Sequence, residues 1–142
     1  MNNFTFKLSL RFFGHSFDPS DVSAELGLVP HVSHKVGEQR RTLDGAELPG
    51  KYDKSYWTAR LAPLEDENPS EALERTIAEL YGHKAFFQAM HARGGRAEFF
   101  IGWFSAGNSG DTLPWDLLGK LAELKIDLAL DVYGSESAQS DD

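Results

Sequence analysis

The 142-residue chain contains no cysteine. Disulfides, thiolate nucleophiles, cysteine-ligated zinc and iron–sulfur clusters on cysteine are therefore excluded. The longest apolar run, residues 99–104, is far shorter than the roughly 20 residues that a membrane-spanning helix needs. The first residues alternate between polar and apolar and lack the continuous apolar stretch of a secretory signal. We therefore expect a cytoplasmic protein with no membrane segment.

Positive charge is also scarce. Lysine and arginine number 14 against 22 aspartate and glutamate residues, which gives a formal net charge of −8. This balance disfavours general nucleic-acid binding, which depends on neutralising phosphates, although it leaves room for a local basic patch. It also suits a basic protein partner, because charge complementarity speeds and selects encounters. With 41% hydrophobic residues, the chain has enough apolar material for the core of one domain.

Four segments show the alternation of a β-strand with one buried face. The pattern is clearest over residues 4–13 and recurs at 56–61, 96–104 and 126–133. In 96–104 both sides are apolar, which predicts cover on both faces by helices or by a partner. In the last segment the predicted buried residues are Ile126, Leu128, Leu130 and Val132.

Helix signals separate these strands. Residues 18–27 carry the cap, the first-turn proline and the terminal glycine of a short helix. Residues 68–71 form a capping box that begins a longer helical region reaching as far as Gly94. Leucines at helical spacing predict a third helix over residues 113–124.

The order of these elements predicts an α+β fold. We expect a single domain over residues 1–133, with a mixed, mostly antiparallel sheet of four or five strands. Its helices lie mainly on one face, in an arrangement related to the ferredoxin-like fold. The strand–helix–strand run across 104–126 predicts a right-handed parallel crossover. Residues 30–54 are predicted to form a long irregular loop with a short strand near 33–36, and residues 134–142 a disordered acidic tail.

Several short sequences together resemble a known family. They are DPSDVSAELGL at 18–28 with Pro30, KVGE at 35–38, YW at 56–57 and a final strand ending in Tyr133. The chain resembles the bacterial and phage "domain of unknown function 4279" family over residues 4–133, although its insertion at 40–54 is long. Because that family has no established activity, the resemblance implies a fold and no catalytic residues. By analogy it suggests an immunity protein that acts like an antitoxin.

No catalytic or cofactor motif is complete. The sequences at 14–18 and 107–111 each end in aspartate where a nucleophile elbow needs glycine. The loop at 105–112 lacks the lysine of a phosphate-binding loop. Asp127 and Asp131 would lie about 13 Å apart along a strand, farther than a glycosidase pair. We predict no catalytic residue and no cofactor, while enzymatic activity stays open because acid–base sites can assemble without motifs.

Histidines offer the only candidate metal ligands of note. His31 and His34 are three residues apart, but no third ligand follows at a regular spacing. His83 and His91 would lie about 12 Å apart along a helix, which is too far for them to share a metal ion. We therefore predict solvated histidines and no metal site.

One local feature runs against the net charge. Residues 34–41 read HKVGEQRR and are basic, and aromatic residues follow. Arginine beside aromatic rings is typical of sites for anions, nucleotides or proteins. The predicted binding residues are Lys35, Arg40, Arg41, Tyr56 and Trp57. The alternative is a solvated loop, with Trp57 in the core.

These observations predict a non-enzymatic protein-interaction module, similar to an immunity or adaptor protein, that binds another protein. The alternative is a sensor for a small anionic ligand or a nucleotide, which would use residues 34–41. A homodimer is a further option, because an apolar face at Phe100 and Phe104 or an unpaired strand edge would favour self-association.

Overall fold

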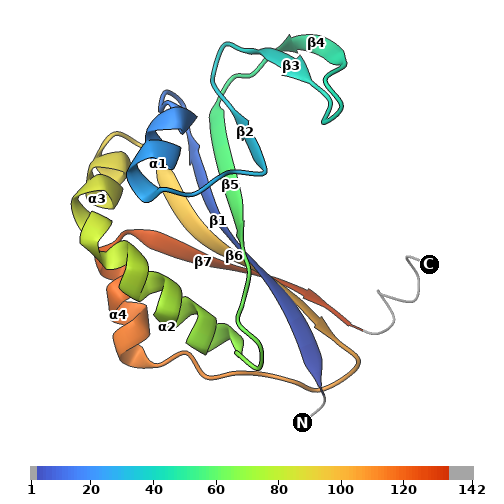
Figure 1. Ribbon diagram of the computed structural model, residues 1–142, viewed down its shortest axis with the longest axis vertical. Helices are drawn as coiled ribbons and strands as arrows, with labels where there is room; N and C mark the ends of the chain where they lie inside the picture. The colour runs from blue at the N-terminus through green and yellow to red at the C-terminus, as the bar shows by residue number, and fades with distance from the viewer. Residues whose placement is uncertain (1–2, 135–142) are drawn as a thin grey trace.

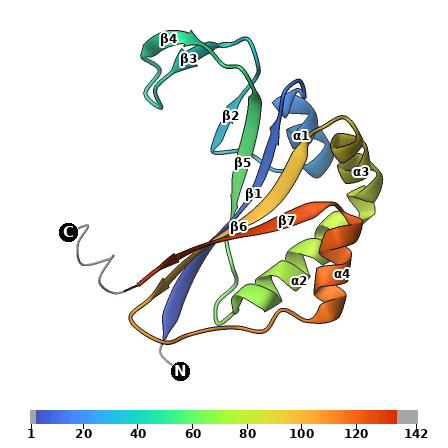
Figure 2. The same ribbon diagram turned by 180° about the vertical axis from the view of Figure 1, so that it is seen from behind.

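The computed structural model describes residues 3–134. In chain order the elements are β1 (Phe4–Gly14), α1 (Pro19–Leu26), β2 (Val32–His34), β3 (Gln39–Arg41), β4 (Glu47–Lys51), β5 (Ser55–Leu61), α2 (Pro69–Leu80), η1 (Tyr81–His83), α3 (Lys84–Ala92), β6 (Arg96–Ser105), α4 (Trp115–Glu123) and β7 (Ile126–Tyr133). Five strands form one sheet in the order β2-β5-β1-β6-β7, and β3 and β4 form a separate hairpin. All four α-helices lie on one side of the sheet (Figures 1 and 2). None of the helices in the described range is long and apolar enough to cross a membrane.

The central strand β1 determines how the sheet is built. It pairs antiparallel with β5 on one side and with β6 on the other, so that Phe12 lies opposite both Trp57 and Ala97. The last strand, β7, runs parallel to β6. The predicted α+β class, the mostly antiparallel sheet with helices on one face and the parallel crossover are therefore confirmed.

Local sequence explains where the helices begin and end. The Asp18 carboxylate accepts a hydrogen bond from the Ser20 N–H at the start of α1, and Gly27 ends this helix with φ of +67°. Asn68 and Glu71 form the predicted capping box at the start of α2. In both helices a proline occupies the first turn, where its missing N–H costs no hydrogen bond.

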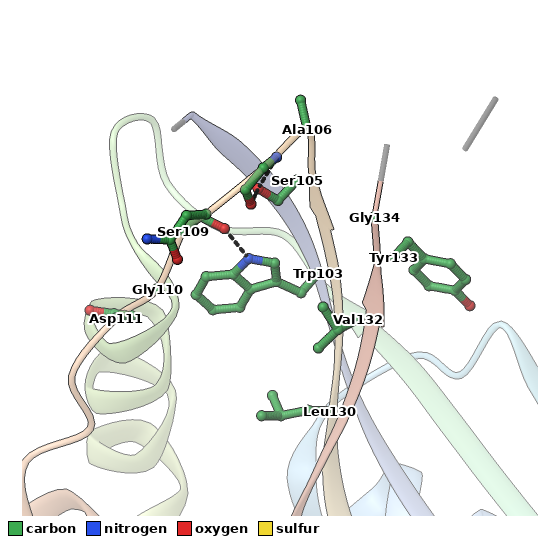
Figure 3. A pocket seen from close by; sticks show the side chains of 12 residues that line it. Trp103, Ser105, Ala106, Ser109, Gly110, Asp111, Leu130, Val132, Tyr133 and Gly134 are labelled. Atoms are coloured by element: carbon green, nitrogen blue, oxygen red, sulfur yellow. Dashed lines mark hydrogen bonds between the residues drawn. The ribbon is translucent and has the colours of Figure 1, made fainter. Parts of the chain in front are cut away.

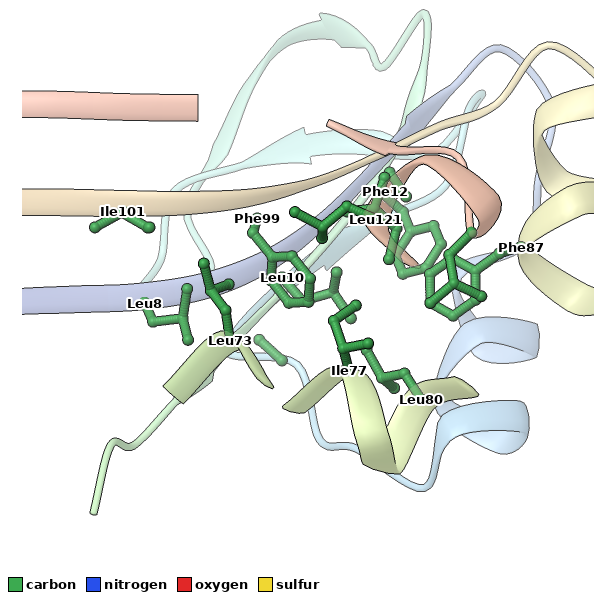
Figure 4. Close-up of a cluster of buried hydrophobic side chains, with 14 of the residues drawn as sticks. Leu8, Leu10, Phe12, Leu73, Ile77, Leu80, Phe87, Phe99, Ile101 and Leu121 are labelled. Carbon is green, nitrogen blue, oxygen red and sulfur yellow. The ribbon is translucent and has the colours of Figure 1, made fainter. Parts of the chain in front are cut away.

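The core lies between the sheet and the helices (Figure 4). Phe12 is fully buried, and its ring lies within 6.5 Å, between ring centroids, of four other aromatic rings. Leu73 and Ile77 of α2 and Leu121 of α4 bury their side chains on this side. Tyr81 and Leu118 have the helical spacing of buried positions but are exposed.

Residues 30–54, expected to be irregular apart from one short strand, contain three strands. The short strand expected at 33–36 is β2, at 32–34, and it pairs with β5. Farther along, β3 and β4 pair antiparallel. Gly45 turns the hairpin with φ of +94°, a conformation that suits glycine. The predicted tail at 134–142 lies, except for Gly134, outside the described residues.

The C-terminal half of β7 is more exposed than its sequence pattern predicts. Ile126 is buried and Leu128 is partly buried, but Leu130 and Val132 are 55% and 66% exposed. The physical reason is that α4 is short and borders a groove lined by Leu128, so it covers only the beginning of the strand. In the same way, the apolar residues on the second side of β6 have no helix over them.

Candidate functional site

The helix-free side of the sheet is the candidate site, and we call it the uncovered face. Side chains alternate between the two sides of a strand, and the strand registers place one set on this side. From the β2 edge to the β7 edge, it includes His34, Tyr56, Thr58, Arg60, Lys7, Arg11, Phe13, Arg96, Glu98, Phe100, Phe104, Asp127, Asp131 and Tyr133. Aromatic rings and cationic groups combine on its β5 and β1 part, whereas its carboxylates lie on β6 and β7.

Cations lie over aromatic rings on this face. The Arg11 guanidinium carbon lies 3.8 Å from the centre of the Phe100 ring, and Lys7 Nζ lies 5.9 Å from that of Phe104. The Phe104 ring also stacks on Tyr133, with centroids 4.8 Å apart and planes 5° from parallel. Gly102 leaves room for the Phe104 ring, because a Cβ at residue 102 would lie only 3.3 Å from that ring. Phe100 and Phe104 remain partly exposed beside these cations.

At the centre of this face, two buried polar atoms have no hydrogen-bond partner among residues 3–134. Arg11 forms an ion pair with Glu98 at 3.7 Å through Nη1, whereas its Nε is buried without a hydrogen bond. The neighbouring Thr58 hydroxyl is also buried and unpaired within the part of the chain that the structure describes. Unsatisfied buried polar groups are uncommon in folded proteins, so these two atoms distinguish the centre of the face, although neither is accessible from outside.

The β3–β4 hairpin projects from one end of the sheet, on the side away from the helices (Figures 1 and 2). His34 stacks on Tyr52 with centroids 3.6 Å apart, and the Tyr52 hydroxyl accepts a hydrogen bond from the Arg41 N–H at 3.4 Å. These contacts connect the hairpin to the sheet.

A cavity of about 540 Å³ opens at the base of the hairpin. Its lining includes three cationic residues, three rings and one carboxylate: Arg40, Lys51, Lys54, His34, Tyr52, Tyr56 and Asp53. Neither lysine forms a salt bridge to any described residue. The cavity therefore offers cationic groups beside aromatic rings, a combination that suits an anionic group attached to a ring.

The predicted binding residues do not form one cluster. Arg40 and Tyr56 line the same cavity. Arg41 points along the hairpin and pairs with Glu47 at 3.5 Å. Lys35 lies beside α1, where it pairs with Asp18 at 3.5 Å. Trp57 lies fully buried on the opposite side of the sheet, where its Nε1–H donates to Ser23 Oγ at 2.9 Å.

The sequence pattern does not single out Arg11, which lies on the polar side of the strand predicted at 4–13. Phe100 was predicted only as part of an apolar face, with Phe104, that would favour self-association. The signal was present in both strands, since each alternation defines a second side as well as a buried one. A single sequence does not reveal the strand register, which places Arg11 directly opposite Glu98.

The stability of this region is expected to depend on pH. Burial lowers the pKa of His34, while a hydrogen bond to the Lys54 backbone opposes this effect. The folded state therefore favours the neutral ring, and the unfolded state binds more protons below its ordinary pKa of about 6.5. The free energy of unfolding should fall as pH drops below that value, and less so in His34→Phe, which keeps a ring against Tyr52.

Urea unfolding at pH 7.5 and pH 5.5 measures this difference. His31, whose pKa is lowered by burial and by the charges of Arg60 and Arg11, is present in both proteins and contributes equally. An identical pH dependence in wild type and His34→Phe would contradict the assignment to His34.

Comparison with known proteins identifies a family for this chain but no individual relative. Neither the comparison with curated proteins nor that with solved structures found a match. A family model described as "Domain of unknown function (DUF4279)" matches residues 4–135, nearly the whole chain, and confirms the resemblance seen in the sequence. The chain therefore belongs to the DUF4279 family of domains of unknown function.

Proposed function

We propose that this chain is a non-enzymatic protein-interaction module of the immunity or adaptor kind and that it binds its partner through the uncovered face. The observation that carries the proposal is the placement of all four α-helices on the other side of the sheet. This leaves Phe13, Phe100 and Phe104 only partly buried. Aromatic residues and arginine are enriched in protein interfaces, and a contiguous apolar patch on a surface marks an interaction site.

The charges of the face specify the chemistry of the partner. Lys7 and Arg60 are exposed, and neither forms a salt bridge within residues 3–134. Arg11 adds a partly exposed guanidinium that lies over the Phe100 ring. The total charge pointed to a basic partner, but the local charges favour a partner surface that is apolar and bears carboxylates.

Charge reversal on the face tests the proposal. Lys7→Glu/Arg60→Glu is compared with Arg93→Glu/Lys120→Glu, which makes the same change in charge at exposed positions outside the face. Tagged proteins capture partners from native lysate at low and high salt, and mass spectrometry identifies them. The affinity of each purified partner is then measured by calorimetry.

The expected result is a stoichiometric partner that binds wild type and the control but binds the face variant at least about tenfold more weakly. Its association should also slow at high salt. Equal binding to the face variant would contradict the proposal.

The cavity at the base of the hairpin favours a second candidate, a sensor of a small anion or nucleotide. Arg40 and Lys51 would hold the anionic group, and Tyr52 or Tyr56 would lie against a ring. In the same capture experiment this function leads to recovery of the chain alone. ATP would then raise its melting temperature in wild type and in Arg41→Ala, but not in Arg40→Ala/Lys51→Ala.

A further inference from the structure

We infer that the outer edge of β7 is an interface at which two copies of this chain pair, forming one continuous sheet about a two-fold axis. This inference rests on a different part of the molecule from the uncovered face. No strand among residues 3–134 pairs with that edge of β7. The strand is eight residues long, keeps a regular register with β6 and contains no proline or lysine. Proteins commonly protect such edges with short strands, bulges, prolines or charged side chains, especially lysines. Of these features β7 has only two aspartates, Asp127 and Asp131, both on the side away from the helices.

The side chains of β7 also lack cover. Leu130 and Val132 point to the helix side, but they extend beyond α4 and are 55% and 66% exposed. Together with Trp103 and the loop at 105–111, they line a cavity of about 650 Å³ (Figure 3). Tyr133 points to the opposite side of the strand. The sequence has the pattern of a strand with one buried face, whereas the single chain buries only the first half of it.

The sequence of β7 is complementary to itself in one register. When Leu130 lies on the two-fold axis, Leu128 faces the partner's Val132 and Val132 faces the partner's Leu128. This forms one apolar stripe on the helix side. On the other side Asp127 faces the partner's Tyr133, so no carboxylate faces another carboxylate.

Neighbouring registers are less favourable. With the axis on Ala129, Asp127 of each copy would face Asp131 of the other copy. Like charges directly opposite each other are destabilising. An axis on Leu128 pairs only five residues of the strand and leaves Val132 outside the paired part. The distribution of charge and apolar side chains thus favours a second copy in the register centred on Leu130.

The absence of cysteine gives a direct test of this register. In an antiparallel pair, residues opposite each other have Cα atoms about 5 Å apart, within the range of a disulfide. The full-length variant Leu130→Cys should therefore form a covalent dimer under mild oxidation. Leu128→Cys should not, because the two copies of residue 128 would lie about 13 Å apart. Val29→Cys, at a position that is 88% exposed elsewhere, controls for random collisions.

The mass of the protein in solution gives a second test that needs no cross-link. Wild type should show a dimer by light scattering after gel filtration, and Leu130→Lys/Val132→Lys should be a monomer with an unchanged circular dichroism spectrum. Val29→Lys/Leu43→Lys, which alters two other exposed apolar residues, should stay dimeric. The inference is overturned by a wild-type monomer at all concentrations or by a dimer that survives the β7 substitutions. Equal cross-linking of Leu128→Cys and Leu130→Cys also overturns it.

Discussion

Replacement of Phe12 by alanine is expected to lower the free energy of unfolding by about 3–5 kcal/mol, the range for large aromatic residues removed from a core. Phe12 has no exposed surface and lies on the central strand β1. Its ring packs against Phe17, Trp57, Phe86 and Phe87, at centroid distances from 5.4 to 6.5 Å. These partners come from a loop, a strand and a helix, so the resulting cavity would loosen contacts between three parts of the chain.

The next residue along β1 provides the matched control. Phe13 lies on the uncovered face and contacts Tyr56, with centroids 5.3 Å apart, and the guanidinium of Arg96 at 6.0 Å. Phe13→Ala should cost no more than about 1–2 kcal/mol, since it removes a ring contact at a partly exposed site and leaves no enclosed cavity. Urea unfolding measures both variants. Equal losses would mean that both sides of the sheet are buried alike.

Gly95→Ala is the second substitution for which we expect a large effect. An alanine Cβ at this position would lie 2.5 Å from Met90 Sδ and 3.0 Å from the Met90 backbone oxygen. The sulfur can move, but the backbone oxygen belongs to the end of α3 and accepts the Gly95 N–H at 2.9 Å. Relief of the contact therefore requires the junction between α3 and β6 to shift. Overpacking of this kind typically costs about 1–3 kcal/mol.

Gly119→Ala is expected to raise the free energy of unfolding. This glycine lies inside α4, and nothing lies within 4 Å of the position of its missing Cβ. Alanine there should stabilise the helix by about 1 kcal/mol, because it restricts the unfolded chain and favours helical backbone. Thermal unfolding of both variants checks the pair. A stable Gly95→Ala protein would show that α3 can move relative to β6 without loss.

Local patterns in the sequence predicted most of the fold. The alternation in residues 4–13 identified β1 and its buried side, and the capping residues identified the start of α2. These features depend on neighbours within a few positions, so a single sequence contains them. The hairpin of β3 and β4 was missed because its strands are short and polar and depend on turns, such as that at Gly45, rather than on buried side chains.

The candidate site was harder to predict because it depends on tertiary contacts. Arg11 and Phe100 lie 89 positions apart in the chain, and only the register between β1 and β6 brings them together. Conversely, Arg40 and Lys35 are near neighbours in sequence but point into different surroundings, one to a cavity at the hairpin and one to Asp18. The distribution of charges along the sequence does not distinguish the surroundings of these two residues.

The position of β1 at the centre of the sheet has a consequence for biosynthesis. A ribosome makes this strand before its two neighbours, which span residues 55–61 and 96–105. The edge that pairs with β5 therefore stays unpaired until residue 61 has been translated, and the edge that pairs with β6 until residue 105 has been translated. Pairings so distant in sequence form slowly, because a long loop must close before any contact compensates for it. During this interval the nascent chain presents an apolar strand with at least one unpaired edge, the kind of segment that is prone to aggregation and that chaperones shield.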